Sequence, residues 1–188
     1  TLRLSTGFGG GKTHTLMTLW HLGRNVSKSE MGEDVIPAEH RPAKVTTIAI
    51  DCGKAGVPDF NTHANVSVHS LWGELFYQLG EAAGASEGLK KLAILGEADH
   101  PEASPNAKQL DSVLPEGPIL ILVDELVIYM AKLSERGQGN LLGFLNLLSS
   151  VVSNRPQTVL VVTDPGQQAV YAQQSQRIAQ QFADCARD

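Results

Sequence analysis

The chain has no long hydrophobic run and few cysteines, and these absences remove several classes of protein. None of its apolar stretches approaches the ~20 residues that a membrane-spanning helix needs, so no membrane contact is expected. No secretory signal peptide is recognisable, which predicts a cytoplasmic location. The two cysteines, Cys52 and Cys185, lie far apart and fit no metal-ligand spacing, so we expect reduced, structural thiols. The six histidines are scattered and predict no metal centre.

Clusters of basic residues are also missing. The 188 residues carry a net charge of −5 and no Lys/Arg-rich run, which leaves no electrostatic footprint for nucleic acid. If nucleic acid is a partner, we expect its contact through segments outside this chain or through other subunits. The hydrophobic fraction of 42% and the charged fraction of 19% are ordinary for a globular protein, and the length suffices for one α/β domain.

The chain does contain a glycine-rich loop at residues 6–13, which ends in Gly-Lys-Thr. The loop follows a short apolar stretch and precedes a helical pattern, which is the strand–loop–helix context of a phosphate-binding P-loop. Glycines let backbone N–H groups close around a phosphate chain because no Cβ blocks the approach, and the helix N-terminus adds a positive dipole end. We therefore expect a nucleotide-binding site formed by Gly7, Phe8, Gly9, Gly10, Gly11, Lys12, Thr13 and His14.

Two residues of this loop have predicted chemical roles. The Lys12 ammonium is expected to reach the β- and γ-phosphates, and the Thr13 hydroxyl is expected to bind Mg²⁺. The consensus pattern has a glycine where this chain has Thr6, so we expect Gly7 to form the turn one residue later. The alternative interpretation is a glycine-rich surface turn that precedes a lysine by chance.

A second motif, an apolar strand followed by two carboxylates, complements the glycine-rich loop. Residues 118–123 form an unbroken apolar run, typical of a strand buried in a parallel sheet, and Asp124 and Glu125 follow it directly. Carboxylates just past a central strand lie where ligands bind in open α/β sheets. This has the form of a Walker B motif, in which Asp124 holds Mg²⁺, directly or through a water, and Glu125 is the general base for the attacking water. The alternative is that Asp124 only caps the following helix.

The adjacent glutamate favours hydrolysis and predicts the NTPase subgroup that has an extra strand between the two motif strands. The predicted strand at 158–163 ends in Thr163 and Asp164. If it occupies that place, Thr163 is the first candidate to sense the γ-phosphate and Asp164 the second. The alternative is ordinary turn chemistry, because Asp-Pro-Gly is a strong turn signal. The chain has no guanine-reading Asn-Lys-x-Asp motif, so ATP is favoured over GTP.

The hydrophobic pattern predicts alternating strands and helices. Strands are expected at 2–5, 45–51, 118–123 and 158–163, and helices at 11–24, 71–79, 88–95, 107–114 and 126–133. A buried helical face is expected at 141–152, loops at 26–42 and 53–65, and a last helix with Tyr171, Ile178, Phe182 and Cys185 on one side.

This alternation predicts an α/β fold, a doubly wound and mostly parallel sheet of the P-loop NTPase type with helices on both faces. Because the pattern begins inside a strand and ends inside a helix, we expect one P-loop ATPase core over 1–188 that is truncated at both ends. Its last strand and any lid domain are expected to be absent.

Two further residues have weaker predicted roles. Arg155 lies between a helix and the fourth predicted strand, and we expect a solvated arginine at a helix end. The alternative is an arginine finger that acts on a neighbouring subunit. Trp72 lies in an apolar helix and is expected to pack in the core.

Four segments together are similar to one family: residues 6–16, 70–75 (Ser-Leu-Trp-Gly-Glu-Leu), 124–126 (Asp-Glu-Leu) and 160–163 (Leu-Val-Val-Thr). Over nearly its whole length the chain resembles a large prokaryotic family of P-loop ATPases of unknown function in the AAA+ superfamily, often encoded beside DNA methylases in phage-defence gene clusters. The Leu-Trp-Gly-Glu segment is the more distinctive part, because many NTPases share the other motifs. The resemblance implies the nucleotide roles given above for Lys12, Thr13, Asp124 and Glu125, in a longer protein.

We therefore expect Mg²⁺-dependent ATP binding and hydrolysis that drives a conformational change in a larger complex, with phage defence or DNA processing as its context. The expected partners are ATP and a homo-oligomer or multi-protein complex. The main alternative is a nucleotide-gated signalling or assembly module with slow or no hydrolysis. A translocase is disfavoured by the acidic charge, a small-molecule kinase by the lack of a basic lid segment, and a non-catalytic scaffold by the intact motifs.

Overall fold

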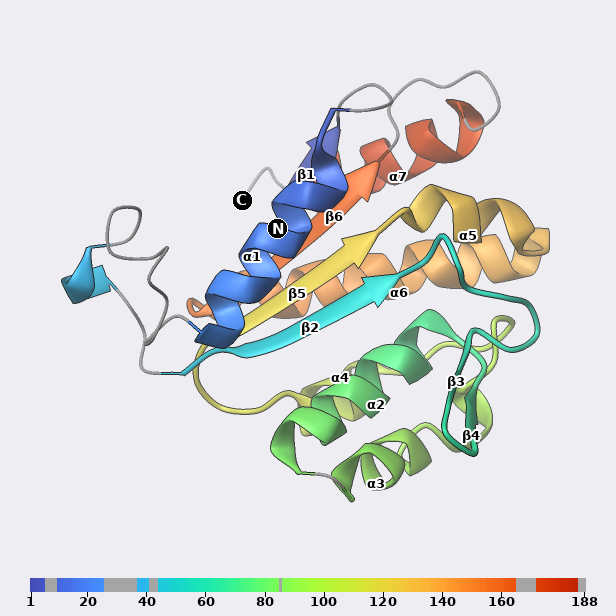
Figure 1. Cartoon of the computed structure of the whole chain (residues 1–188). Coiled ribbons are helices and arrows are strands. Elements are labelled where there is room, and N and C mark those ends of the chain that lie inside the picture. Colours follow the sequence, from blue (N-terminus) through green and yellow to red (C-terminus); the bar gives the residue numbers. More distant parts are fainter. Residues whose placement is uncertain (6–9, 26–36, 41–43, 85, 165–171, 186–188) are drawn as a thin grey trace.

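The computed structural model describes residues 1–5, 10–25, 37–40, 44–84, 86–164 and 172–185, and only the backbone of residues 5, 25, 38, 164 and 181–185. The strands are β1 (Leu2–Ser5), β2 (Thr46–Asp51), β3 (Asn61–His63), β4 (Val66–Val68), β5 (Ile119–Asp124) and β6 (Thr158–Asp164). The helices are α1 (Lys12–Asn25), α2 (Leu71–Ala83), α3 (Glu87–Ala93), α4 (Ala107–Val113), α5 (Leu126–Lys132), α6 (Glu135–Ser153) and α7 (Ala172–Cys185), with 3₁₀ turns at Ala38–His40 and Gly96–Ala98 (Figure 1).

Four of these strands form one parallel sheet in the order β1-β6-β5-β2. The expected α/β class with a parallel sheet is therefore confirmed. The apolar strand β5 lies inside the sheet, where both of its edges are paired, which explains its unbroken hydrophobic sequence. Strand β6 lies between β1 and β5, the place that the glutamate after β5 had predicted for an additional strand.

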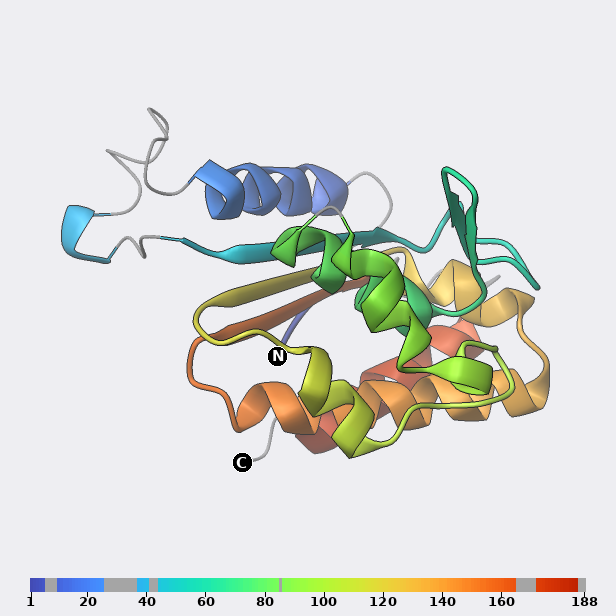
Figure 2. The ribbon, with the colours of Figure 1, turned by 90° about the horizontal axis from the view of Figure 1, so that it is seen from below.

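Helices cover both faces of this sheet, as the sequence predicted. On one face α1 packs its Leu16 against Leu122 of β5 and Val161 of β6. On the other face Ile121 and Val123 of β5 belong to the main core, together with side chains of α2, α5, α6 and α7. Figure 2 shows α1 above the sheet, with α6 and α7 below it. Alternate residues of β5 thus serve two cores, and each fully buried aliphatic side chain contributes about 1.5–3 kcal/mol.

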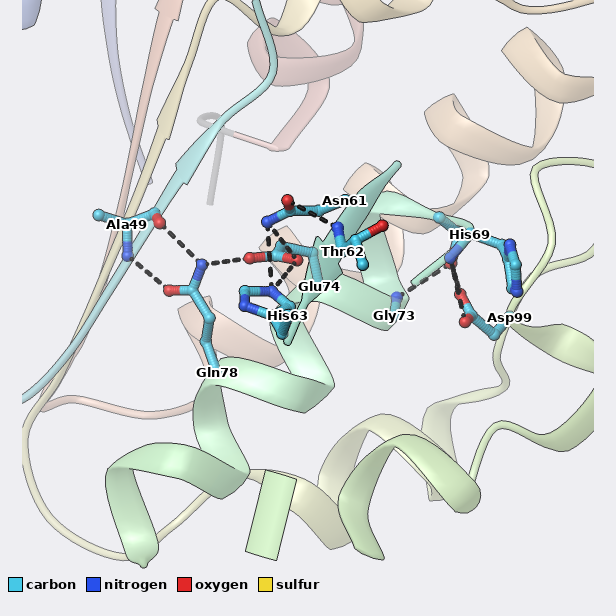
Figure 3. A network of polar contacts seen from close by, with 10 residues as sticks. Ala49, Asn61, Thr62, His63, His69, Gly73, Glu74, Gln78 and Asp99 are labelled. Carbon is cyan, nitrogen blue, oxygen red and sulfur yellow. Dashed lines mark hydrogen bonds and ion pairs between the residues drawn. The ribbon is translucent and has the colours of Figure 1, made fainter. Parts of the chain in front are cut away.

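The prediction of a loop over residues 53–65 is wrong in its last part, because a short antiparallel hairpin of β3 and β4 begins at Asn61. Each hairpin strand has three residues, too few to show a period in the sequence. Tertiary contacts hold the hairpin instead. The Glu74 carboxylate of α2, only 2% exposed, lies 2.8 Å from His63 Nε2 and accepts a hydrogen bond of 3.3 Å from Asn61 Nδ2 (Figure 3). The hydrogen bonds to the carboxylate offset the cost of burying the charge of Glu74.

The same network reaches the edge strand of the sheet. Gln78 donates from Nε2 to Glu74 Oε1 at 2.6 Å and to the carbonyl of Ala49 at 2.9 Å. Its Oε1 accepts a hydrogen bond from the Ala49 amide at 3.2 Å. The Gln78 amide therefore satisfies both backbone groups of an edge residue of β2, as a neighbouring strand would. This pairing fixes α2 and the hairpin against β2 (Figure 3).

The Leu-Trp-Gly-Glu segment opens α2 at a crowded place. Ser70 caps the helix by accepting a hydrogen bond from Gly73 N, and Asp99 accepts one of 2.6 Å from Ser70 Oγ. Trp72 is fully buried, which confirms its expected core role, and its indole N–H donates to Ala98 O at 2.5 Å. A Cβ at Gly73 would overlap the Asp99 carboxylate and lie 2.8 Å from Val68 Cγ1. Glycine is thus required here by close packing.

The remaining expected elements are confirmed to within about two residues, except that α2 runs on to Ala83 and that α6, which carries the buried face expected at 141–152, begins at Glu135. Ile178 of α7 is buried as expected. Tyr171 lies outside the described residues, and so do most of the loop expected at 26–42 and the side chains of Phe182 and Cys185. In the described part of the chain, no helix combines the length and the apolarity that crossing a membrane requires.

We expect Gly73→Ala to lower the free energy of unfolding by about 1–3 kcal/mol, because the new methyl group overpacks a buried site. Gly143→Ala is the matched control, since a Cβ at this exposed position in α6 meets no atom within 4 Å. It should raise stability by about 0.5–1 kcal/mol. Urea denaturation of both variants measures the difference, and equal stabilities would contradict the packing argument.

Candidate functional site

The motif residues gather at the edge of the sheet where the parallel strands end. Ser5 of β1 pairs in register with Asp164 of β6, and Asp51 of β2 pairs with Asp124 of β5. Because parallel strands present their carboxyl ends at one edge, segments far apart in sequence meet there. The N-terminal turn of α1, which follows the glycine-rich loop, contributes Thr13 to the same place.

The carboxylate of Asp124 lies at the centre of this group. Its Oδ2 accepts a hydrogen bond of 2.8 Å from the Thr13 hydroxyl. Its Oδ1 accepts hydrogen bonds from the Thr163 hydroxyl and, at 3.1 Å, from the backbone N–H of Glu125. Asp124 thus joins α1, β5 and β6 through one side chain. The expected proximity of Thr13, Asp124 and Thr163 is therefore seen in the structure.

Thr163 contacts both Asp124, the last residue of β5, and Glu125, the residue that follows it. Its side chain is 1% exposed and donates to Asp124, while its oxygen accepts a hydrogen bond of 3.0 Å from the Glu125 amide. The hydroxyl therefore fixes the Asp124 carboxylate and the backbone of Glu125 together. Asp164 ends β6 at the same edge, but its side chain lies outside the described residues.

Glu125 has an unusual backbone conformation, with φ of 52° in the left-handed region. It is the N-cap of α5, yet its side chain makes no capping hydrogen bond. The alternative in which Asp124 caps this helix is wrong, because Asp124 is the last residue of β5 and its oxygens accept from Thr13, Thr163 and the Glu125 amide. Backbone strain of this kind costs about 1–3 kcal/mol and clusters at functional sites.

The charges around Glu125 have opposing effects on its carboxyl group. Partial burial is the largest cause that raises the pKa of Glu125, and the negative charges of Asp124 and Asp51 raise it further. The positive charges of Lys12 and Lys54 lower the pKa of Glu125 and so favour its ionised form. Lys12, which is half-buried, therefore lies close enough to act on the site electrostatically.

Asp51 is a site residue that the sequence reasoning missed. It ends β2 directly beside Asp124, accepts a hydrogen bond of 3.0 Å from Gly53 N and forms an exposed ion pair of 3.1 Å with Lys54. The signal was present, because the predicted strand at 45–51 ends in an aspartate just as the motif strand does. A carboxylate at the end of a parallel strand next to Asp124 has to lie at the same edge.

The glycine-rich loop is described only in part. The expected ligands Gly7, Phe8 and Gly9 lie outside the described residues, whereas Gly10 and Gly11 are exposed just before α1. Gly11 has φ of +73°, a conformation that glycine adopts without strain. His14 is exposed in the first turn of α1, where its carbonyl accepts a hydrogen bond from the Thr18 hydroxyl.

The donor atoms at this edge fit Mg²⁺ better than a transition metal. The Thr13 hydroxyl and the Asp124 carboxylate are hard oxygen ligands, and both line a cavity of about 280 Å³ that Asp51 also borders. Among the described residues no group of three His, Cys, Asp or Glu side chains could hold a metal by itself. Mg²⁺ in phosphate sites needs only one or two carboxylates, because water and phosphate supply the other ligands.

Arg155 is less exposed than the solvated arginine that the sequence predicts at this helix end. Its side chain is 27% exposed and donates from Nη1 to Asp111 at 3.3 Å and from Nη2 to the carbonyl of Pro115 at 2.7 Å. These contacts tie the segment before β6 to α4 and to the segment before β5. Because Arg155 precedes β6, it lies at the opposite edge of the sheet from Asp124 and Glu125.

The model of one protein family, described as the DUF499 N-terminal domain, matches residues 2–183, and the chain therefore belongs to this family. The match covers every strand of the sheet and both predicted motifs. Comparison with curated proteins and with solved structures gave no match.

Thr163→Val should lower the free energy of unfolding by about 1–3 kcal/mol, because Asp124 and the Glu125 amide lose a buried partner without a change in side-chain shape. Thr158→Val, on the same strand, is the control. The Thr158 hydroxyl is buried and has no hydrogen-bond partner among the described residues, so its removal should be neutral or stabilising. Chemical denaturation of both variants gives the two values, and equal values would contradict the stabilising role expected for the hydrogen bonds of the Thr163 hydroxyl.

Proposed function

We propose that this domain binds ATP together with Mg²⁺ and hydrolyses it. The observation that carries the proposal is the position of the Asp124 carboxylate. It accepts hydrogen bonds from the hydroxyl groups of Thr13 in α1 and Thr163 in β6, and it is next to the exposed Glu125. A glycine-rich loop that ends in Gly-Lys-Thr leads into the same helix. A surface turn without a function would not require Thr13 to meet the end of β5.

The residues have separate roles in the proposed site. Thr13 would bind Mg²⁺ through its hydroxyl, and Asp124 would hold the ion directly or through a water. When bound, the ion would supply positive charge that offsets the negative charge of the phosphate chain. The loop amides and the Lys12 ammonium would hold the phosphate chain at the N-terminus of α1. Thr163 would keep Asp124 in place and is the candidate to sense the γ-phosphate.

Glu125 is the proposed general base. Its carboxylate would take a proton from a water molecule whose oxygen attacks the γ-phosphorus, and the bond to the bridging oxygen breaks to release ADP and phosphate. Its position as the N-cap of α5 suits this role. The backbone N–H donates hydrogen bonds to Asp124 and Thr163, while the side chain makes no capping hydrogen bond. Lys12 and Lys54 favour the ionised form that a base requires.

The wider context is part of the proposal as well. The resemblance to AAA+ ATPases of phage-defence gene clusters supports a domain whose hydrolysis drives a conformational change in a homo-oligomer or multi-protein complex, in phage defence or DNA processing. The strand order, with β6 between the strands of the two motifs, is compatible with the subgroup of P-loop NTPases that has an extra strand at this place.

Glu125→Gln should leave ATP binding intact and lower kcat by about 10²–10⁴-fold, because the amide cannot accept the proton. Lys12→Ala should weaken binding of Mg²⁺-ATP by more than about tenfold, through loss of a charge-assisted phosphate contact. A fluorescent ATP analogue measures binding, and phosphate release measures turnover.

The matched controls are Glu87→Gln and Lys90→Ala, which break an exposed ion pair on α3 away from the site. Both should behave as wild type. Binding without turnover in the wild-type protein would favour the nucleotide-gated module. Unchanged turnover in Glu125→Gln would show that Glu125 is not the general base. If the folded wild-type protein does not bind ATP, the proposed function is wrong.

A further inference from the structure

The loop that follows β2 lies directly against the side chain of Glu125. Cys52, fully buried, extends the pairing of the two strands by donating from its amide to the Asp124 carbonyl at 3.0 Å. Gly53 then donates its amide to Asp51 Oδ1. The chain thus turns at Gly53 within the site, between the carboxylates of Asp51 and Glu125.

Gly53 makes room for the Glu125 carboxylate. A Cβ at this position would overlap Glu125 Oε2, lie 3.1 Å from Glu125 Cδ and lie 3.2 Å from Asp51 Oδ1. The backbone of Gly53 has no left-handed φ, so the lack of a side chain matters here for close approach and not for backbone freedom. The backbone at Gly53 therefore forms one wall of the space that Glu125 occupies.

Lys132 holds this wall in place through hydrogen bonds to its backbone. Its ammonium donates to the carbonyl of Gly53 at 3.1 Å and to that of Ala55 at 2.7 Å. Lys132 is the last residue of α5, the short helix whose N-cap is Glu125. One end of α5 therefore presents Glu125, while the other end anchors the loop against which the Glu125 side chain rests. Ala55, 2% exposed, fixes the far side of the loop in the core.

We propose that Gly53 and Lys132 are positioning residues that keep the Glu125 carboxylate where it can reach the attacking water. The inference rests on the proposed ATPase function and adds the device that aligns its base. In the proposed reaction neither residue transfers a proton or binds the phosphates. Their effect is on alignment, and a displacement of about 1 Å in a reacting group can cost about 10²-fold in rate.

Gly53→Ala tests the wall. The atoms that a new methyl group meets are at the flexible ends of the Glu125 and Asp51 side chains, and the closest is Glu125 Oε2, so the fold can accommodate the methyl group by moving the Glu125 carboxylate. We expect kcat to fall by about 10- to 100-fold while the KM and the Kd for Mg²⁺-ATP stay within about twofold of wild type. Gly139→Ala is the control, because an added Cβ in this exposed part of α6 has no neighbour within 4 Å.

Lys132→Met tests the anchor and should also lower kcat with little change in Kd. Lys132→Arg, which keeps donors for two carbonyls, should restore most of the rate. Lys91→Met is the matched control, since Lys91 also donates to a backbone carbonyl, that of Val113 at 2.6 Å, but in the α2–α4 region away from the site. Thermal unfolding of each variant shows whether the fold is kept, and Gly53→Ala decides the matter if Lys132→Met unfolds.

The outcomes separate this inference from the proposed function. If wild type turns over ATP and Glu125→Gln does not, wild-type rates in Gly53→Ala and Lys132→Met would overturn the positioning role alone. A rise in KM or Kd that matches the fall in kcat/KM would overturn it too, because the residues would then act on binding. If wild type shows no turnover, the proposed function fails and the positioning role fails with it.

Discussion

The parallel alignment of β1, β6, β5 and β2 is the constraint on which the candidate site depends. Strands that run in one direction place all their carboxyl ends at one edge of the sheet, so whatever follows them is brought together. For this reason three different strands bring together Asp51, Asp124 and Thr163. With an antiparallel neighbour, one of these residues would lie at the opposite edge.

The alignment is stable because the central strands are covered on both faces. Residues of β5 alternate between the small cluster under α1 and the main core under α5, α6 and α7. Packing of Leu16 against Leu122 and Val161 sets the height of α1 over the sheet, and this brings Thr13 within hydrogen-bond distance of Asp124. The polar site is thus positioned by apolar contacts one turn away from it.

The outer edge of the sheet is organised by polar groups. Glu74 is buried because His63, Asn61 and Gln78 satisfy its oxygens, and Gln78 in turn occupies the free edge of β2 at Ala49. Two residues farther along, β2 ends at Asp51 and turns at Gly53 toward Glu125. The distinctive Leu-Trp-Gly-Glu segment therefore builds the support for one side of the site without entering it.

Much of this arrangement is local and readable from the sequence. The β-branched and apolar runs, the glycine loop and the Asp-Glu pair predict the strands, their parallel class and most of the residues at the edge, because burial on two faces demands long apolar strands. Asp51 also ends a predicted strand, as a site residue would. Its place in the site is recognised only once Asp51 is known to pair beside Asp124. The three-residue strands of the hairpin are too short to show the alternating hydrophobic pattern of a strand in the sequence.

By itself, the sequence determined the α/β class, the order of the helices and of the four strands of the main sheet, and the candidates Lys12, Thr13, Asp124, Glu125 and Thr163. Only the tertiary structure decided that β6 lies between β1 and β5, that Arg155 is engaged at the opposite edge, and that Gly53 and Lys132 border Glu125. The physical reason is distance along the chain. Periodicity records which face of an element is buried, whereas contacts between residues that are tens of positions apart depend on how whole elements pack.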